Sequence, residues 1–431
     1  MVALFKALQV ILALSILIIV HEFGHFLFAK IFGIKVEKFY LFFDVGGKAL
    51  LRFRIGETEF GIGWLPFGGY CKIAGMVDES VDMDQLKRDP QPWEFRSRPA
   101  WQRLLVLAGG VLFNFIFAVV MYSAICGIWG TAYISNRDSA VYPNDLAREM
   151  GFLPGDRILK LDDFVPEDFG MLQADLARRG VRCATVLRGQ DTVRLYIDQS
   201  MIGEVLNSPL MFDLAMPMVI DSVASQTNAG ALAKGDVVLR IDGQDARFLQ
   251  DASPILAERA GQTVTATVRR GCVISDVPLQ VDTAGRLGIL VSPPVVKRET
   301  YRGLDAVPAG LRRTGSTIKG YLSDLKMIFK PSTKAYKSVG SFIAIGQVFP
   351  KKWDWYQFTN ILALLSIMLG VVNLIPIPGL DGGHILFTLY EMITGRKPSD
   401  KFLYIMQLIG MVLIFALMFL AFGNDIMRLI R

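Results

Sequence analysis

The stretch Val10–His25, VILALSILIIVHEFGH, decides both the fold and the chemistry expected of this chain. Its apolar run Val10–Val20 lies within a longer apolar segment from about Ala7 to Ala29. That length is close to the roughly 20 residues that an α-helix needs to cross about 30 Å of hydrocarbon. The sequence therefore predicts a membrane-spanning helix that carries the polar motif HEFGH near one end.

Two histidines four residues apart, His21 and His25, share one face of such a helix, with Cβ atoms about 5–6 Å apart. Both rings can then reach one metal ion at roughly 2.0–2.1 Å, and Glu22 beside them can take a proton from water activated by the metal. An ionisable group in mid-membrane costs about 2.5–3.5 kcal/mol, so these polar side chains need a compensating partner. We expect a zinc site with His21 and His25 as ligands and Glu22 as the catalytic base.

A catalytic zinc usually has three protein ligands and one water. The segment Asn373–His384, NLIPIPGLDGGH, offers a third ligand in Asp381, which interrupts an apolar region rich in prolines and glycines. Such residues break a helix and expose backbone around a cavity. Two alternatives stay open: Asp381 caps a helix over His384–Tyr390, or His384 is the ligand in its place.

Three further apolar segments have the length of a membrane span, and they run from about Leu104 to Trp129, Phe358 to Pro378 and Phe402 to Gly423. Apolar residues make up 52% of the chain and charged residues 20%, and the mean hydropathy is +0.39. This balance indicates membrane spans mixed with soluble parts. A cleaved signal peptide is an alternative for the first span, but no AxA-like cleavage site is present and apolar residues resume after HEFGH.

The basic residues predict the orientation of the chain. Twelve Lys and Arg residues lie between the first and second spans, and three lie between the third and fourth. The positive-inside rule places both of these loops in the cytoplasm. We therefore expect both termini and the segment from about 131 to 355 to lie on the outer, periplasmic side of a bacterial inner membrane.

The outward segment contains an internal repeat. Residues 147–162 read AREMGFLPGDRILKLD, and residues 227–244 read TNAGALAKGDVVLRIDGQ, so that the two Gly-Asp pairs are 80 residues apart. Mixed strand and helix signals at this period predict two tandem α+β modules, over 135–212 and 213–295. Their pattern resembles PDZ domains of bacterial proteases, which capture extended peptides by strand addition. The alternative is that the modules are spacers without a ligand.

Apolar residues recur at helical spacing after the modules, within the region 300–350, at Leu311, Ile318, Leu322, Leu325 and Ile328. This pattern predicts an amphipathic helix. Two interpretations stay open, namely a helix on the membrane surface and a helix packed on the second module.

Composition also excludes some functions. The net charge of +6 is modest and basic residues form no long run, so we expect no nucleic-acid partner. The four cysteines are scattered without a CxxC pair, which argues against a cysteine zinc site or a disulfide framework.

HEFGH in the first span and NLIPIPGLDGGH in the third, with tandem PDZ-like modules between them, resemble the site-2 protease family of intramembrane zinc metalloproteases, and most of all its bacterial regulator of sigma-E protease branch. The resemblance covers nearly the whole chain. It implies a zinc endopeptidase that acts on single-span membrane proteins, such as anti-sigma factors or signal-peptide remnants. It also supports His21, His25 and Asp381 as ligands, Glu22 as base and Asn373 as a substrate contact.

Two further segments carry the resemblance. Gly61–Gly75, GIGWLPFGGYCKIAG, is similar to the family's re-entrant β-hairpin, expected over about 50–75, whose edge would hold substrate through Gly68, Gly69 and Tyr70. An ordinary cytoplasmic hairpin is the alternative. Asn114 matches a family asparagine that is usually preceded by Gly-Pro, and it is a candidate supporting residue.

The chain departs from the family pattern at two positions. Gly110 replaces the proline that usually precedes the asparagine, and Phe342 replaces a proline near the entry to the third span. These exchanges put the local helix geometry in doubt and leave the ligand set untouched.

Taken together, these features predict a polytopic α-helical membrane protein with four transmembrane helices, a re-entrant β-hairpin and two tandem α+β PDZ-like domains. The protease core is expected in two halves, 1–130 and 355–431. Its expected partners are single-span membrane proteins, peptide segments at the modules and the lipid bilayer. The competing hypotheses are a non-catalytic, membrane-anchored PDZ scaffold and a metal transporter.

Overall fold

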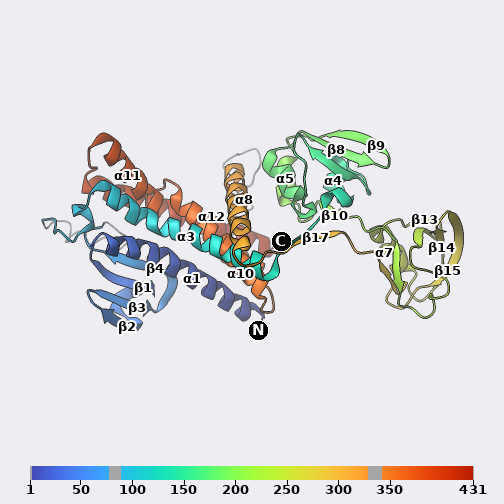
Figure 1. Cartoon of the computed structure of the whole chain (residues 1–431), viewed down its shortest axis with the longest axis horizontal. Helices are drawn as coiled ribbons and strands as arrows, with labels where there is room; N and C mark the ends of the chain where they lie inside the picture. Colours follow the sequence, from blue (N-terminus) through green and yellow to red (C-terminus); the bar gives the residue numbers. More distant parts are fainter. Residues whose placement is uncertain (1, 77–88, 329–341, 431) are drawn as a thin grey trace. The chain divides into compact units, whose positions relative to one another are not determined.

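The computed structural model describes residues 2–76, 89–328 and 342–430. These residues form two compact units, each described here by itself. The first unit combines the two ends of the chain, and the second holds Ala132–Glu299. Figure 1 shows the helices of the first unit and the small sheets of the second.

Four helices of the first unit are long and apolar enough to cross a membrane. They are α1 (Val2–Ile31), α3 (Ala100–Trp129), α10 (Trp355–Leu374) and α12 (Asp400–Ile430). All four predicted spans are therefore confirmed as apolar helices of sufficient length, which fits a multi-pass membrane protein. The third ends at Leu374 rather than at Pro378, because prolines at positions 376 and 378 disfavour continuation of a helix.

Helices α1 and α3 cross with almost no space between their backbones. A Cβ atom added at Gly24 would lie 2.2 Å from the carbonyl oxygen of Gly109, and one added at Gly109 would lie 2.5 Å from that of Gly24. Small residues allow helices in membranes to approach this closely. On the other side of α3, Ala118 and Ile125 pack with Ala363 of α10. Helix α3 is therefore the central support of the first unit.

The segment after α10 turns back on itself before α11 (Asp381–Thr394) begins. A Cβ at Gly382 would lie 2.2 Å from the carbonyl oxygen of Ile375, and one at Gly383 would lie 2.6 Å from that of Ile377. The two glycines thus let the first turn of α11 rest on the preceding loop. The predicted helix over His384–Tyr390 forms, and it begins at Asp381.

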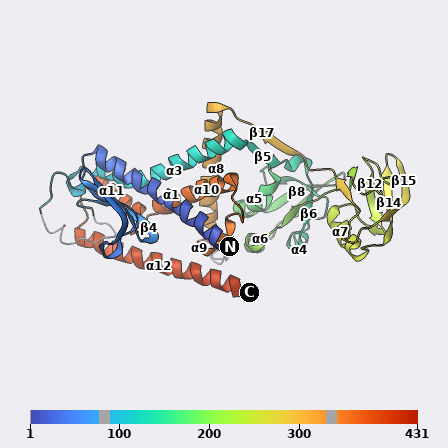
Figure 2. The same ribbon diagram turned by 90° about the horizontal axis from the view of Figure 1, so that it is seen from below.

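A four-stranded sheet follows α1, built from β1 (Val36–Phe43), β2 (Ala49–Ile55), β3 (Thr58–Gly63) and β4 (Leu65–Ile73). The strand order is β2-β3-β1-β4, with β1 parallel to β3 and antiparallel to β4. Figure 2 shows this sheet beside α1. One face packs on α1 through Phe26, whose ring contacts those of Phe39 and Phe60.

The sheet corrects the expectation that Gly61–Gly75 folds as a hairpin. Strands β3 and β4 do not pair, because β1 lies between them. A hairpin does occur within the expected region of about 50–75, but it joins β2 to β3 through a two-residue turn at Gly56-Glu57. A single residue, Trp64, separates β3 from β4, which is too short for the usual two-residue hairpin turn.

The second unit contains two copies of a common core, in which two strands, a helix, two further strands and a last strand follow in that order, with small additions in each copy. The first copy comprises β6 (Val141–Pro143), α4 (Asp145–Glu149), β7 (Arg157–Leu161), α5 (Leu172–Arg179), β8 (Cys183–Arg188), β9 (Asp191–Tyr196), α6 (Ile202–Asn207) and β10 (Phe212–Leu214). The second comprises β11 (Ile220–Val223), β12 (Val237–Ile241), β13 (Gln244–Asp245), α7 (Leu249–Glu258), β14 (Thr263–Arg270), β15 (Val273–Gln280) and β16 (Ile289–Val291). In each copy the first strand pairs with the last, β6 with β10 and β11 with β16. Strand β10 crosses the expected boundary at 212/213.

The repeated Gly-Asp motif has the same structural role in both copies. Asp156 accepts two hydrogen bonds from the guanidinium of Arg188, and Asp236 accepts two from that of Arg270. Each carboxylate also accepts a backbone N–H from three residues earlier. The hydrogen bonds from Arg270 hold the pKa of Asp236 below its usual range. The repeat seen in the sequence is therefore a repeat in three dimensions.

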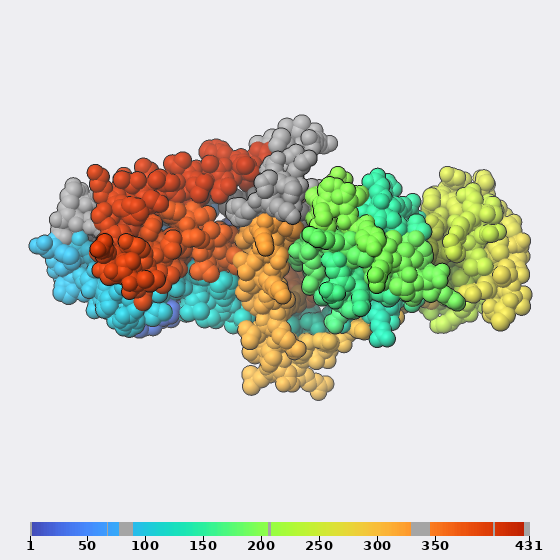
Figure 3. Space-filling view, turned by 90° about the horizontal axis from the view of Figure 1, so that it is seen from above, coloured from blue at the N-terminus to red at the C-terminus, as the bar shows by residue number. Residues whose placement is uncertain are grey.

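Strands β5 (Thr131–Ile134) and β17 (Val296–Glu299) pair with each other where the chain enters and leaves the modules. Helix α8 (Ala306–Ile328) follows, and Figure 3 shows it as a light orange column. A Cβ at Gly310 would lie 2.2 Å from Ser123 Oγ of α3, and Ile318 and Leu325 pack on the α3–α10 cluster. The predicted amphipathic helix is present, and part of its apolar face packs on other helices of the first unit, which neither open interpretation anticipated.

Helix α9 (Phe342–Val348) precedes α10. It begins at Phe342, where the sequence departs from the family pattern. The preceding residues 339–341 and the side chain of Phe342 lie outside the described residues.

Candidate metal centre

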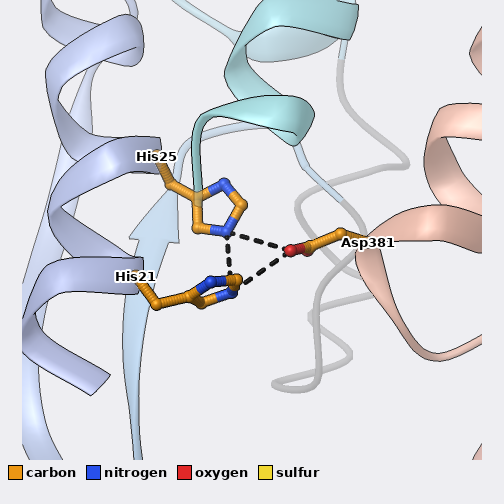
Figure 4. Close-up of side chains that lie close together, drawn as sticks. All are labelled: His21, His25 and Asp381. Carbon is orange, nitrogen blue, oxygen red and sulfur yellow. Dashed lines mark hydrogen bonds and ion pairs between the residues drawn. The ribbon is translucent and has the colours of Figure 1, made fainter. Parts of the chain in front are cut away.

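Two histidines of α1 and one carboxylate of α11 converge on a single point. The Nε2 atoms of His21 and His25 lie 3.3 Å apart. Oδ2 of Asp381 lies 3.2 Å from Nε2 of His21 and 3.4 Å from Nε2 of His25. Figure 4 shows the two rings on neighbouring turns of α1, with the carboxylate approaching from the opposite side. In the part of the chain that the structure describes, this is the one group of three such side chains able to share an ion.

The backbone of α3 forms one wall of this centre. A Cβ atom at Gly110 would lie 2.5 Å from Nε2 of His25 and 2.6 Å from Cε1 of His21. Position 110 therefore has no space for a side chain in this structure, and a proline here would collide with both rings. At Gly110, where the chain departs from the family pattern, the absence of a side chain lets α3 lie against both rings.

The hydrogen bonding of His25 leaves its Nε2 available to a metal. Its Nδ1 lies 2.9 Å from the carbonyl oxygen of Val106. A carbonyl oxygen can accept but never donate, so Nδ1 carries the hydrogen, and in the neutral ring Nε2 then keeps its lone pair. A backbone acceptor of this kind is the usual means of orienting a metal-binding histidine.

The carboxylate of Asp381 has the orientation of a ligand rather than of a helix cap. Asp381 is the first residue of α11, the residue before it is the N-cap, and no side chain caps this helix end. Its Oδ2 is buried and lies against Nε2 of both histidines. A cation between the three ligand atoms would satisfy this oxygen. Two imidazole nitrogens and one carboxylate oxygen are also a donor set that catalytic zinc sites use.

The alternative ligand His384 faces elsewhere. Its Nε2 lies 3.1 Å from Oε1 of Gln407 on α12. The structure therefore brings Asp381, and not His384, to the two histidines.

Glu22 is a residue of α1, and its side chain faces the edge strand β4. Its carboxylate accepts a hydrogen bond from the backbone N–H of Cys71, and it interacts electrostatically with both histidines and Asp381. A carboxylate at the margin of the centre is positioned to exchange a proton with a molecule held there.

Both candidate asparagines contact His21. Nδ2 of Asn373, in the last turn of α10, lies 3.3 Å from Nε2 of His21. Nδ2 of Asn114, on α3, lies 3.0 Å from its Nδ1, and Asn114 has no exposed surface. Asn373 contacts the ring atom that faces the centre, whereas Asn114 contacts the ring atom on the far side.

The three candidate residues of β4 have visible structural roles. Gly68 has a φ of +126°, a conformation that favours glycine. A Cβ at Gly69 would lie 2.5 Å from Cγ2 of Ile18, so this glycine lets β4 approach α1. Tyr70 donates a hydrogen bond of 2.7 Å to Asp44. Their contact with substrate stays a prediction.

Several contributors to the centre were missed in the sequence. They are the carbonyl of Val106, the N–H of Cys71 and the backbone at Gly110. Every residue has a backbone carbonyl, and all but proline have an N–H, so the sequence does not show which of these groups face the centre. A single glycine in an apolar helix is also too common to indicate a site. The close spacing of Gly109, Gly110 and Asn114 was the one available hint.

Comparisons with known proteins agree with this geometry. The model of Peptidase family M50 matches residues 9–417. A protein of Vibrio cholerae and one of Xylella fastidiosa strain 9a5c, each named "Putative zinc metalloprotease", are 30% and 29% identical to the chain, over 99% and 97% of both sequences respectively. The regulator of sigma-E protease RseP of Salmonella typhimurium is 29% identical, over 97% of this chain and 98% of its own. The chain therefore belongs to peptidase family M50, the site-2 protease family, and is a zinc metalloendopeptidase.

Proposed function

We propose that His21, His25 and Asp381 hold the zinc ion and that Glu22 is the catalytic base. The observation that carries this proposal is the convergence of three ligand atoms from distant parts of the chain. Two Nε2 atoms come from α1, which is long and apolar enough to cross a membrane, and one carboxylate oxygen comes from the start of α11. The proposed reaction is hydrolysis of a peptide bond in or near the transmembrane segment of a single-span membrane protein.

The chemistry divides between the ion and the protein. When bound, zinc lowers the pKa of a water molecule toward about 7 and polarises the scissile carbonyl. The carboxylate of Glu22 accepts the proton of the attacking water and later delivers it to the leaving amide nitrogen. The carboxamide of Asn373 faces the same centre and donates a hydrogen bond to the substrate carbonyl as negative charge develops on it.

We further propose that β4 presents the substrate to this centre as an extended strand. Among the described strands β4 pairs with β1 alone, and the N–H of Cys71 faces Glu22 instead of β1. A helical substrate hides its peptide bonds in its own hydrogen bonds, so pairing with an edge strand would expose them. Gly68, Gly69 and Tyr70 lie on this strand and would line the substrate. The sheet would then be the functional equivalent of the re-entrant hairpin.

The substrates and the cellular location follow from the relatives and the charge pattern. One relative is named a regulator of sigma-E protease. The resemblance to that branch implies anti-sigma factors or signal-peptide remnants as substrates of this chain. The basic loops favour a bacterial inner membrane with both termini and the modules on the periplasmic side. The proposed domains are core halves 1–130 and 355–431, PDZ-like modules 135–212 and 213–295, and a connecting helical region 300–350.

The decisive experiment combines metal analysis with cleavage of a model transmembrane peptide by the purified chain in lipid nanodiscs. We expect about one zinc per chain and cleavage that stops when a chelator removes it. Zinc without cleavage of any transmembrane peptide would favour the scaffold. Zinc flux into vesicles without cleavage would favour the transporter.

A further inference from the structure

Asn114 contacts His21 at Nδ1, the ring nitrogen that faces away from the candidate centre. It lies on α3 without exposed surface, and its backbone carbonyl accepts a hydrogen bond of 2.8 Å from Ser366 of α10. Its Nδ2 lies 3.0 Å from Nδ1 of His21, whereas its Oδ1 is buried and makes no hydrogen bond in the described structure. One half of the carboxamide thus has a partner and the other half has none.

The two histidines differ in what holds their far ring nitrogen. Val106 offers His25 a carbonyl oxygen, which fixes the hydrogen on Nδ1 and leaves Nε2 free for a metal. His21 instead meets a carboxamide, which can either donate through nitrogen or accept through oxygen. The orientation of this one carboxamide therefore decides whether Nδ1 of His21 accepts or donates a hydrogen bond.

Each orientation of that carboxamide selects a different state of His21. With nitrogen toward the ring, Nδ1 must accept, so the hydrogen lies on Nε2 and can be shared with Asp381 at 3.2 Å. With oxygen toward the ring, Nδ1 donates, and Nε2 keeps the lone pair that a metal requires. The nitrogen and oxygen of a carboxamide are similar in size, so half a rotation exchanges them without new packing.

We propose that Asn114 is a positioning residue whose Oδ1 accepts a hydrogen bond from Nδ1–H of His21 when zinc is bound, which leaves Nε2 of His21 free to bind the metal. The inference rests on the proposed zinc ligation by His21. It gives His21 the hydrogen-bond acceptor that Val106 gives His25. Asn114 contacts neither the metal position nor the substrate side of the ring, so it acts through His21 alone.

Zinc affinity, measured by competition with a chromogenic chelator, tests the proposal. Asn114→Leu removes the acceptor at similar size, and we expect affinity to fall roughly 10- to 100-fold. Asn114→Asp keeps an acceptor in every orientation, and we expect it to retain near wild-type affinity. Ser366→Ala is the matched control, since it removes the neighbouring hydrogen bond and leaves the carboxamide in place. Asn114→Ala replaces the leucine variant if that protein does not elute as a folded species.

Each outcome is decisive. Unchanged affinity in Asn114→Leu or Asn114→Ala overturns the inference, and so does an equal loss in Asn114→Asp, because the acceptor is then irrelevant. His21→Ala provides the reference for the ligand set. If His21→Ala loses zinc while the Asn114 variants do not, the inference alone fails. If His21→Ala keeps its zinc, the proposed ligand set fails and the inference fails with it.

Discussion

Oδ2 of Asp381 lies 3.2 Å from Nε2 of His21, and this contact joins the first residue of α11 to the helix near the start of the chain. Neither motif forms the centre alone. Helix α3 connects the two parts of the core. Its glycines allow α1 to approach closely on one side, and α10 packs against its other side. Metal binding should therefore depend on the packing of these helices as well as on the ligands themselves.

The assignment of Glu22 as base predicts a clean separation of metal binding from catalysis. Glu22→Gln has the same shape but cannot accept the proton, so we expect about one zinc per chain and a loss of cleavage of at least ~10²- to 10⁴-fold. Metal analysis and a peptide-cleavage assay on the same preparation measure both quantities. Glu149→Gln, at an exposed position of α4, is the control and should behave as wild type. An active Glu22→Gln protein would remove Glu22 from this role.

The choice between Asp381 and His384 gives a second prediction. Asp381→Ala removes the carboxylate 3.2 Å and 3.4 Å from the two histidines, so zinc should be lost or strongly weakened. His384→Ala removes a contact with Gln407 and should keep its zinc. Metal content after dialysis against a weak chelator compares the two variants. The reverse pattern, with zinc kept by Asp381→Ala and lost by His384→Ala, would restore the alternative ligand.

The candidate site was largely predictable because its side chains carry strong signals. His21, Glu22 and His25 follow from spacing on one helix, and Asp381 follows from a polar residue in a broken apolar segment. The orientation of the rings was not predictable, because it depends on the carbonyl of Val106 and on the absence of a side chain at Gly110.

The fold was predictable where hydrophobic length decides it, and less so where long-range pairing decides it. The four spans follow from apolar runs. The insertion of β1 between β3 and β4 does not, since no local pattern in 36–43 identifies strand partners that lie 21 to 37 residues later. The packing of α8 on α3 was equally unpredictable, because an apolar helix face does not reveal which surface will cover it.

The steric role of Gly110 gives a third prediction. In Gly110→Ala the new Cβ would lie 2.5 Å from Nε2 of His25, so α3 or the ring must move. We expect weaker zinc binding and lower activity, although alanine favours helix by about 1 kcal/mol over glycine. Gly423→Ala makes the same exchange in α12, where a Cβ meets nothing within 4 Å, and should leave zinc affinity unchanged. Equal zinc affinity in the two variants would contradict the conclusion that the backbone at Gly110 packs directly against the two histidine rings.

The edge of β4 gives a fourth prediction. Cys71→Pro removes the backbone N–H that donates a hydrogen bond to Glu22. It also interrupts the strand edge that would pair with substrate. Prolines are tolerated on edge strands, so the sheet should still form. We expect this variant to keep its zinc and to lose most cleavage of a transmembrane peptide. Cys71→Ala keeps the N–H and should cleave far better than the proline variant. Equal cleavage by two folded variants would argue against substrate pairing at β4.

The modules give the last prediction, which separates a filter from a catalyst. In the described part of the second unit no group of three metal-binding side chains occurs, so the modules should control which substrates arrive and not the cleavage step. The N–H of Ser135 lies 3.3 Å from the carbonyl oxygen of Val295, so residues 136–294 can be removed and the ends joined by a short Gly-Ser linker.

We expect the deleted enzyme to keep its zinc and to cleave short substrates as the full chain does. Cleavage of substrates with a bulky outward domain should rise relative to trimmed ones, because the modules no longer obstruct them. Both enzymes are compared on both substrate forms, and the zinc content shows that the shortened protein is folded around its centre. If the ratio of trimmed to untrimmed cleavage is the same for both enzymes, the modules do not select by size. A peptide-sensing role, as the resemblance to PDZ domains implies, would then be the better interpretation of the modules.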